Sequence, residues 1–142
     1  MKQSIDFLPE RKQRDLHELV GLIRDEVKDV VMIILYGSYA RNTYVELDIR
    51  RDYGGGKIQY MSDYDILVVS KKRLGSRTVT VSSRVKSSFL KNKNADTQTR
   101  PQIINESITK FNNALSEGRY FYVDILTEGI VLYDSGECQL AT

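Results

Sequence analysis

The sequence predicts a fold of the α+β class, because strand-like apolar runs and segments of helical periodicity occur together in it. Residues 30–35 (VVMIIL) and 66–69 (ILVV) are short, apolar and rich in β-branched side chains, which suits buried strands. Apolar side chains in residues 9–28 recur every three or four positions, which is typical of an amphipathic helix. A four-residue apolar spacing over residues 81–89 predicts a second helix, which we expect to carry most of a basic region.

The segment between the two apolar runs has the pattern of a β-hairpin. Apolar and polar residues alternate at Val45 and Leu47, and strand-like residues resume after three consecutive glycines, Gly54 to Gly56. Those glycines could in principle hold a phosphate, but a phosphate loop leads into a helix, and here strand-like residues follow. The pattern therefore favours a flexible hairpin tip.

The last third of the chain is predicted to alternate between strands and helices. Its residue pattern indicates an edge strand at 101–108, a short helix ending near Gly118, a segment at 119–128 that fits either a strand or a helix, and a strand at 130–133 that follows a stop at Gly129.

Length and composition are those of one globular domain, which we expect to span residues 1–142. Hydrophobic residues make up 41% of the chain and charged residues 28%. No apolar run approaches the roughly 18 residues that span a bilayer, and the first ten residues lack the apolar core of a secretory signal. A single cysteine, Cys138, cannot form an internal disulfide. We therefore expect a cytoplasmic protein with no membrane association.

Charge is distributed unevenly along the chain. Residues 71–100 contain nine Lys or Arg and one Asp or Glu, whereas residues 101–142 contain two and six. A basic block of this kind can attract phosphate-bearing ligands or nucleic acid, but it is equally typical of a solvated surface. Nucleic-acid binding is therefore a minor alternative.

Two aspartates open the second apolar run. In a strand, Asp63 and Asp65 would project from the same side, about 6.6 Å apart along the backbone, while Tyr64 points away. Two carboxylates so close repel one another unless a cation lies between them. Magnesium prefers such hard oxygen ligands and takes phosphate oxygens in its remaining positions.

A Gly-Ser turn closes the first apolar run. Gly37 allows the backbone to approach a phosphate closely, and Ser38 offers a hydroxyl and an amide donor at a helix start. Together with the two aspartates, this turn indicates a nucleoside triphosphate held by a metal ion and by backbone donors.

At these residues the chain resembles the minimal nucleotidyltransferases of the polymerase β superfamily. Their signature is Gly-Ser, a spacer, and Asp-x-Asp within an apolar strand, which YGSYAR and SDYDILVV match. The stretches FNNALSEGRYFYVDIL and EGIVLYDSG also resemble the subgroup that is found beside, or fused to, a HEPN domain. The resemblance covers about residues 11–136.

The resemblance implies a mixed β-sheet flanked by helices, with the hairpin as an insertion at about 43–61. It also implies transfer of a nucleoside monophosphate, such as AMP from ATP or from another nucleoside triphosphate, to a protein or small hydroxyl acceptor. By this resemblance Gly37 and Ser38 bind the triphosphate, Asp63 and Asp65 hold Mg²⁺, and Arg41 contacts phosphate. The implied partner is a HEPN domain in cis or in trans, and we expect the natural protein to continue past residue 142.

Two features depart from the family pattern. The spacer, residues 39–62, is 24 residues long, and the hairpin accounts for its unusual length. The family places a third carboxylate on the next strand, where this chain has Gln102, with Glu106 and Asp124 as rival substitutes. The alternative is therefore a catalytically weak nucleotide-binding module that neutralises a HEPN partner by contact.

Overall fold

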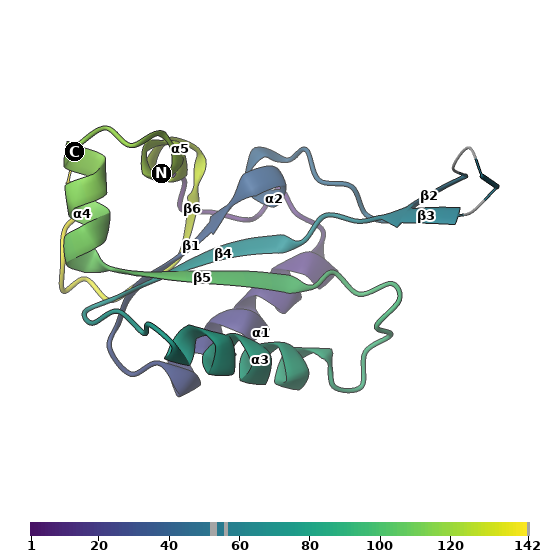
Figure 1. Ribbon diagram of the computed structural model, residues 1–142, viewed down its shortest axis with the longest axis horizontal. Helices are drawn as coiled ribbons and strands as arrows, with labels where there is room; N and C mark the ends of the chain where they lie inside the picture. The colour runs from purple at the N-terminus through teal and green to yellow at the C-terminus, as the bar shows by residue number, and fades with distance from the viewer. Residues whose placement is uncertain (52–53, 56, 142) are drawn as a thin grey trace.

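A four-stranded mixed β-sheet lies between helices in the computed structural model (Figure 1), which describes residues 1–51, 54–55 and 57–141. The elements in chain order are α1 (Glu10–Glu26), β1 (Val30–Tyr36), α2 (Gly37–Arg41), β2 (Asp48–Arg51), β3 (Lys57–Tyr60), β4 (Tyr64–Ser70), α3 (Arg77–Leu90), β5 (Pro101–Ser107), α4 (Ile108–Ser116), α5 (Tyr120–Glu128) and β6 (Ile130–Asp134).

The sheet has the order β5-β4-β1-β6, and its strands run in mixed directions. β1 is antiparallel to both β4 and β6, whereas β4 and β5 are parallel. The predicted α+β class and the mixed sheet flanked by helices are therefore confirmed. β5 lies at one edge of the sheet, as its sequence predicts.

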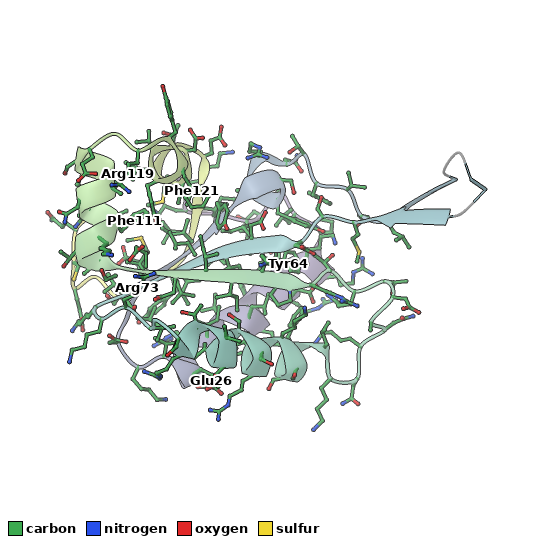
Figure 2. The ribbon with its side chains drawn as sticks, in the orientation of Figure 1. Glu26, Tyr64, Arg73, Phe111, Arg119 and Phe121 are labelled. Carbon is green, nitrogen blue, oxygen red and sulfur yellow. The ribbon has the colours of Figure 1, made fainter. Side chains whose placement is uncertain are left out.

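Helices cover the two faces of the sheet in pairs. Side chains of α1 and α3 form one core with one face of β1 and β4, and Phe111 of α4 and Ile125 of α5 form a second core with the other face. Figure 2 shows Phe111 and Phe121 on the side of α4 and α5, away from Glu26 at the end of α1. The two central strands are thus buried on both faces, which explains their continuous apolar runs.

Both predicted long helices are confirmed, and each buries the stripe that predicted it. α1 buries Leu16, Leu19 and Ile23, and α3 buries a stripe of Val81, Val85 and Phe89. The expectation that α3 carries most of the basic block is wrong. Only three of the nine basic residues of 71–100, Arg77, Arg84 and Lys86, lie in α3, because the others flank it in loops.

The predicted hairpin is present as β2 and β3, which pair antiparallel with each other and project from the body of the molecule (Figure 1). Val45 and Leu47, which were expected in its first strand, precede that strand. Val45 instead ties the base of the hairpin, because its N–H donates to the Ser62 hydroxyl at 2.8 Å and its carbonyl accepts from the Ser62 N–H at 2.8 Å. Gly56 of the predicted tip lies outside the described residues.

The ambiguous segment 119–128 is helical. The N–H of Gly129 donates to the Ile125 carbonyl at 2.8 Å and closes α5, after which the chain enters β6. α4 starts at an N-cap, where the Ser107 hydroxyl accepts from the Lys110 N–H, and it ends before Gly118 as predicted. The result is a compact strand–helix–helix–strand unit that brings α5 against β1.

Among the described residues, none of the helices combines the length and the apolar character that crossing a membrane requires.

Gly129 is the glycine whose replacement should disturb this packing. A Cβ there would lie 2.4 Å from the Ile125 carbonyl oxygen and 2.9 Å from Cγ2 of Ile34, so backbone and core would have to shift. We expect Gly129→Ala to lower the free energy of unfolding by about 1–3 kcal/mol, measured by urea denaturation. Gly21→Ala is the control, because a Cβ inside α1 meets nothing within 4 Å, and it should stabilise by about 0.5–1 kcal/mol. An unchanged stability of Gly129→Ala would contradict the packing described.

Candidate active site

The Gly37 turn lies directly against the Asp65 carboxylate. β1 ends at Tyr36, the register partner of Asp65 on β4, and the chain then turns into the five-residue helix α2. Gly37 has φ +74°, and a Cβ added to it would lie 2.3 Å from Oδ2 of Asp65. A side chain at this position would therefore collide with the carboxylate, and only glycine permits both the backbone conformation and the close approach.

The two aspartates lie at the same end of β4. Asp65 is the second residue of the strand and is partly buried, whereas Asp63 is exposed and precedes the strand instead of lying within it. The residue between them, Tyr64, is fully buried and belongs to the core formed with α1 and α3. Because neighbouring strand residues face opposite sides, Asp65 faces the side of α4 and α5.

The charges of Asp63 and Arg41 both act on the Asp65 carboxyl. Burial raises the pKa of Asp65 above its ordinary value of 3.8, and the Asp63 charge raises that pKa further, whereas the Arg41 charge lowers it. Burial and then the Asp65 charge raise the pKa of Tyr36 to about 12. Burial and the Asp63 charge thus disfavour the ionised form of Asp65. A cation bound here would be stabilised, because it would compensate both negative charges.

Arg41, at the end of α2, is already engaged by an acidic side chain. Its Nη1 lies 3.4 Å from Oε2 of Glu128 on α5, and both side chains are about half exposed. An ion pair of this exposure contributes little stability. The guanidinium can therefore exchange Glu128 for another anion at small cost.

A cavity of about 210 Å³ opens beside the turn on the α5 side. Its lining consists of Tyr36, Gly37, Arg41, Phe121, Asp124, Ile125 and Glu128. The Phe121 and Tyr36 rings meet edge to face with centroids 5.7 Å apart. Sequence reasoning did not place Phe121 or Glu128 near the turn, and no local signal could have done so, because α5 reaches the turn only in the folded chain, where it packs on α2 and β1.

The strand next to the aspartates carries a neutral side chain at the matching position. Gln102 of β5 is the parallel register partner of Asp65. Glu106 pairs four positions further along, opposite Val69, and accepts a hydrogen bond from the Tyr122 hydroxyl at 3.4 Å. Asp124 lines the cavity beside Gly37. Of the two rival carboxylates, Asp124 is the one that shares a cavity with the turn.

The donor set suits one magnesium ion and not two. Asp63 and Asp65, whose charges interact, offer carboxylate oxygens of the kind that Mg²⁺ prefers, and phosphate and water oxygens could complete an octahedron around the ion. No group of three or more His, Cys, Asp or Glu side chains gathers for a metal in the part of the chain that the structure describes. Gln102 supplies an amide where a bridging carboxylate would serve a second ion.

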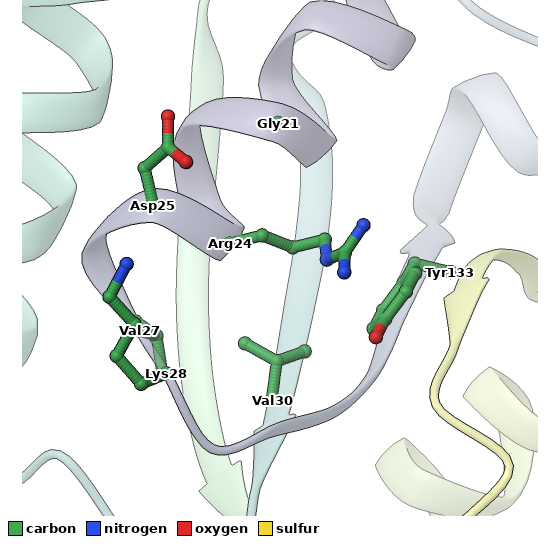
Figure 3. Close-up of a pocket in the computed structure, with 7 residues that line it drawn as sticks. All are labelled: Gly21, Arg24, Asp25, Val27, Lys28, Val30 and Tyr133. Atoms are coloured by element: carbon green, nitrogen blue, oxygen red, sulfur yellow. The ribbon is translucent and has the colours of Figure 1, made fainter.

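A second cavity, of about 400 Å³, lies at the opposite end of β1, near Val30 (Figure 3). The Arg24 guanidinium, one of the groups that line this cavity, lies over the Tyr133 ring at 4.2 Å from its centroid. Its lining combines charged side chains at the C-terminal end of α1 and just after it with one aromatic ring, and it contains no carboxylate pair. The Gly37 turn, which lies beside Asp65 and Asp63, is therefore the candidate site.

The basic block is partly neutralised by acidic neighbours. Lys71 lies 2.6 Å from Glu137, Arg84 lies 3.5 Å from Glu26, and Lys93 lies 3.0 Å from Glu18. Nucleic-acid binding by residues 71–100 stays a prediction.

No family model matches the chain, and the comparison with curated proteins found no match. Among solved structures, the chain is similar to one described as "a putative nucleotidyltransferase from Sulfolobus solfataricus", with 15% sequence identity and a TM-score of 0.47. The likeness covers 94% of this chain and 92% of that one. A likeness of this size carries no argument about activity, so the functional assignment rests on the site itself.

The raised pKa of Asp65 predicts a pH-dependent gain in stability on removal of its charge. A carboxyl with a higher pKa in the folded chain contributes stability below pH 3.8, and that stability is lost as the pH rises through the folded value. Asp65→Asn should therefore raise the free energy of unfolding at pH 7, and the gain should shrink below pH 3.8, where wild type is also neutral. Urea denaturation at both pH values measures the difference. A variant that is less stable than wild type at pH 7 would contradict the repulsion described.

Proposed function

We propose that the chain is a magnesium-dependent nucleotidyltransferase that moves a nucleoside monophosphate, AMP from ATP, onto a hydroxyl of a protein or small molecule. The observation that carries the proposal is the contact of the Gly37 turn with the Asp65 carboxylate, beside Asp63 and Arg41. This arrangement combines a carboxylate pair for a divalent ion with backbone that can approach a phosphate. The resemblance of YGSYAR and SDYDILVV to the minimal nucleotidyltransferases supports the same reaction.

Each side chain has a distinct role in the proposed reaction. The hydroxyl and backbone amide of Ser38 hold the triphosphate where Gly37 leaves room for it, and Arg41 leaves Glu128 to contact a phosphate oxygen. Asp63 and Asp65 would hold Mg²⁺, which, when bound, neutralises phosphate charge. The acceptor oxygen then forms a bond to the α-phosphorus while the bond to the pyrophosphate breaks. Gln102 cannot accept the acceptor's proton, because an amide is not basic, so the proton passes to water or to a base on the acceptor.

A HEPN domain, in cis or in trans, is the acceptor that we propose. It is the partner implied by the resemblance of the C-terminal stretches to the HEPN-associated subgroup, and the proposed antitoxin-like role is modification of that domain.

Loss of transfer in carboxylate variants tests the reaction. The chain is incubated with labelled ATP, Mg²⁺ and the cognate HEPN partner, and label on the partner is measured. We expect Asp63→Asn to reduce transfer about a hundredfold or more, and the Asp63→Asn/Asp65→Asn double variant to abolish it, because the carboxylates that would hold the ion are then lost. Transfer that survives the double variant would refute the proposal.

Gly37→Ala and Gly75→Ala form a matched pair for the same assay. Both glycines have positive φ, +74° and +59°, so alanine strains the backbone at either position. Only at Gly37 would the new Cβ reach the carboxylate, because nothing lies within 4 Å at Gly75. Gly37→Ala should therefore lose transfer while Gly75→Ala retains it.

A second candidate is neutralisation of the HEPN domain by contact alone. It is favoured by Gln102, the neutral side chain beside Asp65. A growth or ribonuclease assay with the Asp63→Asn/Asp65→Asn variant separates the two candidates. We expect protection from the HEPN partner to be lost with the carboxylates, and protection that persists would instead identify a contact module.

A further inference from the structure

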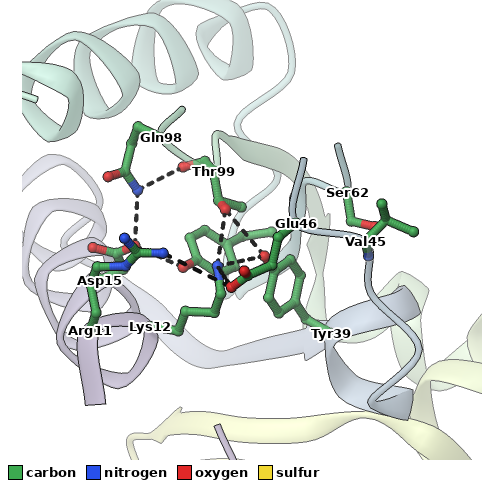
Figure 4. Close-up of polar contacts among 10 residues, drawn as sticks. Arg11, Lys12, Asp15, Tyr39, Val45, Glu46, Ser62, Gln98 and Thr99 are labelled. Atoms are coloured by element: carbon green, nitrogen blue, oxygen red, sulfur yellow. Dashed lines mark hydrogen bonds and ion pairs between the residues drawn. The ribbon is translucent and has the colours of Figure 1, made fainter. Parts of the chain in front are cut away.

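Helix α1 buries two charged side chains against the sheet, on the face opposite Asp65. Lys12 is 3% exposed and Asp15 is 7% exposed. They are three positions apart and therefore share one face of the helix. Lysine and aspartate are almost never this buried unless their charges are compensated. Both charges are compensated by polar contacts with neighbouring side chains, which Figure 4 shows.

Lys12 binds the residue that follows Ser38. Its ammonium donates to the Tyr39 hydroxyl at 2.9 Å and to the Thr99 hydroxyl at 3.3 Å, and it lies 3.5 Å from Glu46. It is also 5.1 Å from the centroid of the Tyr39 ring and 5.5 Å from that of Tyr44, and these two rings are stacked on each other. Lys12 thus ties α2 to α1 through the Tyr39 side chain.

Asp15 binds the residue between the two aspartates. Its Oδ2 accepts from the Tyr64 hydroxyl at 2.7 Å and from Nε2 of Gln98 at 2.9 Å. Hydrogen bonds to a charged acceptor are about twice as strong as those between neutral groups. The bond fixes Tyr64 toward α1, and because strand residues alternate, it turns Asp65 toward the Gly37 turn.

The two anchors are joined to each other. The Tyr39 and Tyr64 rings have centroids 4.7 Å apart, and Thr99 bonds both the Tyr39 hydroxyl and Lys12. Each tyrosine is thus adjacent in sequence to a proposed site residue and is bound to a charge on the same helix.

From these contacts we infer that Lys12 and Asp15 are positioning residues, which hold the Gly37–Ser38 turn and the Asp63–Asp65 pair at a fixed separation through Tyr39 and Tyr64. The inference rests on the proposed function for its catalytic meaning. Neither charge lies on the substrate side, since both are buried and bond to tyrosines of the core formed with α1. Apolar side chains of similar volume often replace buried charges with no loss of stability, so the charges are explained by the geometry that they specify.

Two conservative variants test the inference. Tyr39→Phe and Tyr64→Phe keep the buried rings and remove one hydroxyl each. Ser70→Ala is the matched control, because it removes a fully buried hydroxyl at the far end of the same strand, where Ser70 donates to the Lys72 carbonyl at 2.6 Å and accepts from Asn105 at 3.0 Å.

Amide hydrogen exchange is the first measurement and needs no activity. We expect exchange at residues 37–41 and 64–66 to become at least about tenfold faster in both tyrosine variants, relative to β6, as for the loss of one hydrogen bond to a charged group. Ser70→Ala should leave these amides within about twofold of wild type. Unchanged exchange in the tyrosine variants, or an equal effect of Ser70→Ala, would overturn the inference.

Binding of Mg²⁺-ATP is the second measurement. Its Kd should rise about tenfold in the tyrosine variants and stay unchanged in Ser70→Ala, and an unchanged Kd in the tyrosine variants overturns the inference. Lys12→Met should loosen residues 37–41 in the exchange experiment without lowering the midpoint of urea unfolding, which a merely stabilising lysine would lower. If the wild-type chain binds no Mg²⁺-ATP, the proposed function fails, and the exchange experiment still decides the positioning role.

Discussion

The contact between Gly37 and the Asp65 carboxylate is the constraint on which the rest of the site depends. It requires a residue without a Cβ, a positive φ at the end of β1, and a β4 register that sets Asp65 opposite Tyr36. It also leaves a carboxylate partly buried and close to another negative charge, which raises its pKa. This arrangement lowers the stability of the fold. Strained or mutually repulsive groups of this kind concentrate at functional sites, where a bound ligand relieves the repulsion.

Successive side chains of β4 point alternately to the two faces of the sheet, so its core residues and its proposed site residue lie on opposite faces. Tyr64, Ile66 and Val68 face the core beneath α1 and α3, and Asp65 faces the side of the proposed reaction. A slip of one residue in register would exchange the two sets. The buried hydrogen bond between Tyr64 and Asp15 therefore has a consequence on the opposite face of the sheet, because it selects which of the neighbouring side chains can meet the Gly37 turn.

The neutral Gln102 beside Asp65 shapes the proposed chemistry. A carboxylate there would repel Asp65 further without a second ion, whereas an amide leaves the pair compatible with one ion. An amide cannot take a proton from the acceptor, so the acceptor's own environment has to do so. Asp124 shares the cavity beside Gly37 but comes from a helix, not from the neighbouring strand. The aspartate pair thus suits the binding of one metal ion, but the neighbouring strand supplies no base for the transfer. Both proposed functions, catalysis and neutralisation by contact, are compatible with that combination.

The sequence alone determined the elements, because periodicity and glycine positions are local: the α1 and α3 stripes, the apolar runs of β1 and β4, the hairpin and the stop at Gly129 were all predictable. The resemblance to the minimal nucleotidyltransferases also predicted one site from Gly37, Ser38, Asp63 and Asp65, and the structure brings two of these residues, Gly37 and Asp65, against each other. Only the tertiary structure decided that residues 119–128 form a helix, that Phe121 and Glu128 reach the turn, and that Lys12 and Asp15 are buried. These outcomes depend on contacts between residues far apart in the chain, and a charged residue in an amphipathic helix carries no local mark that it will face the core.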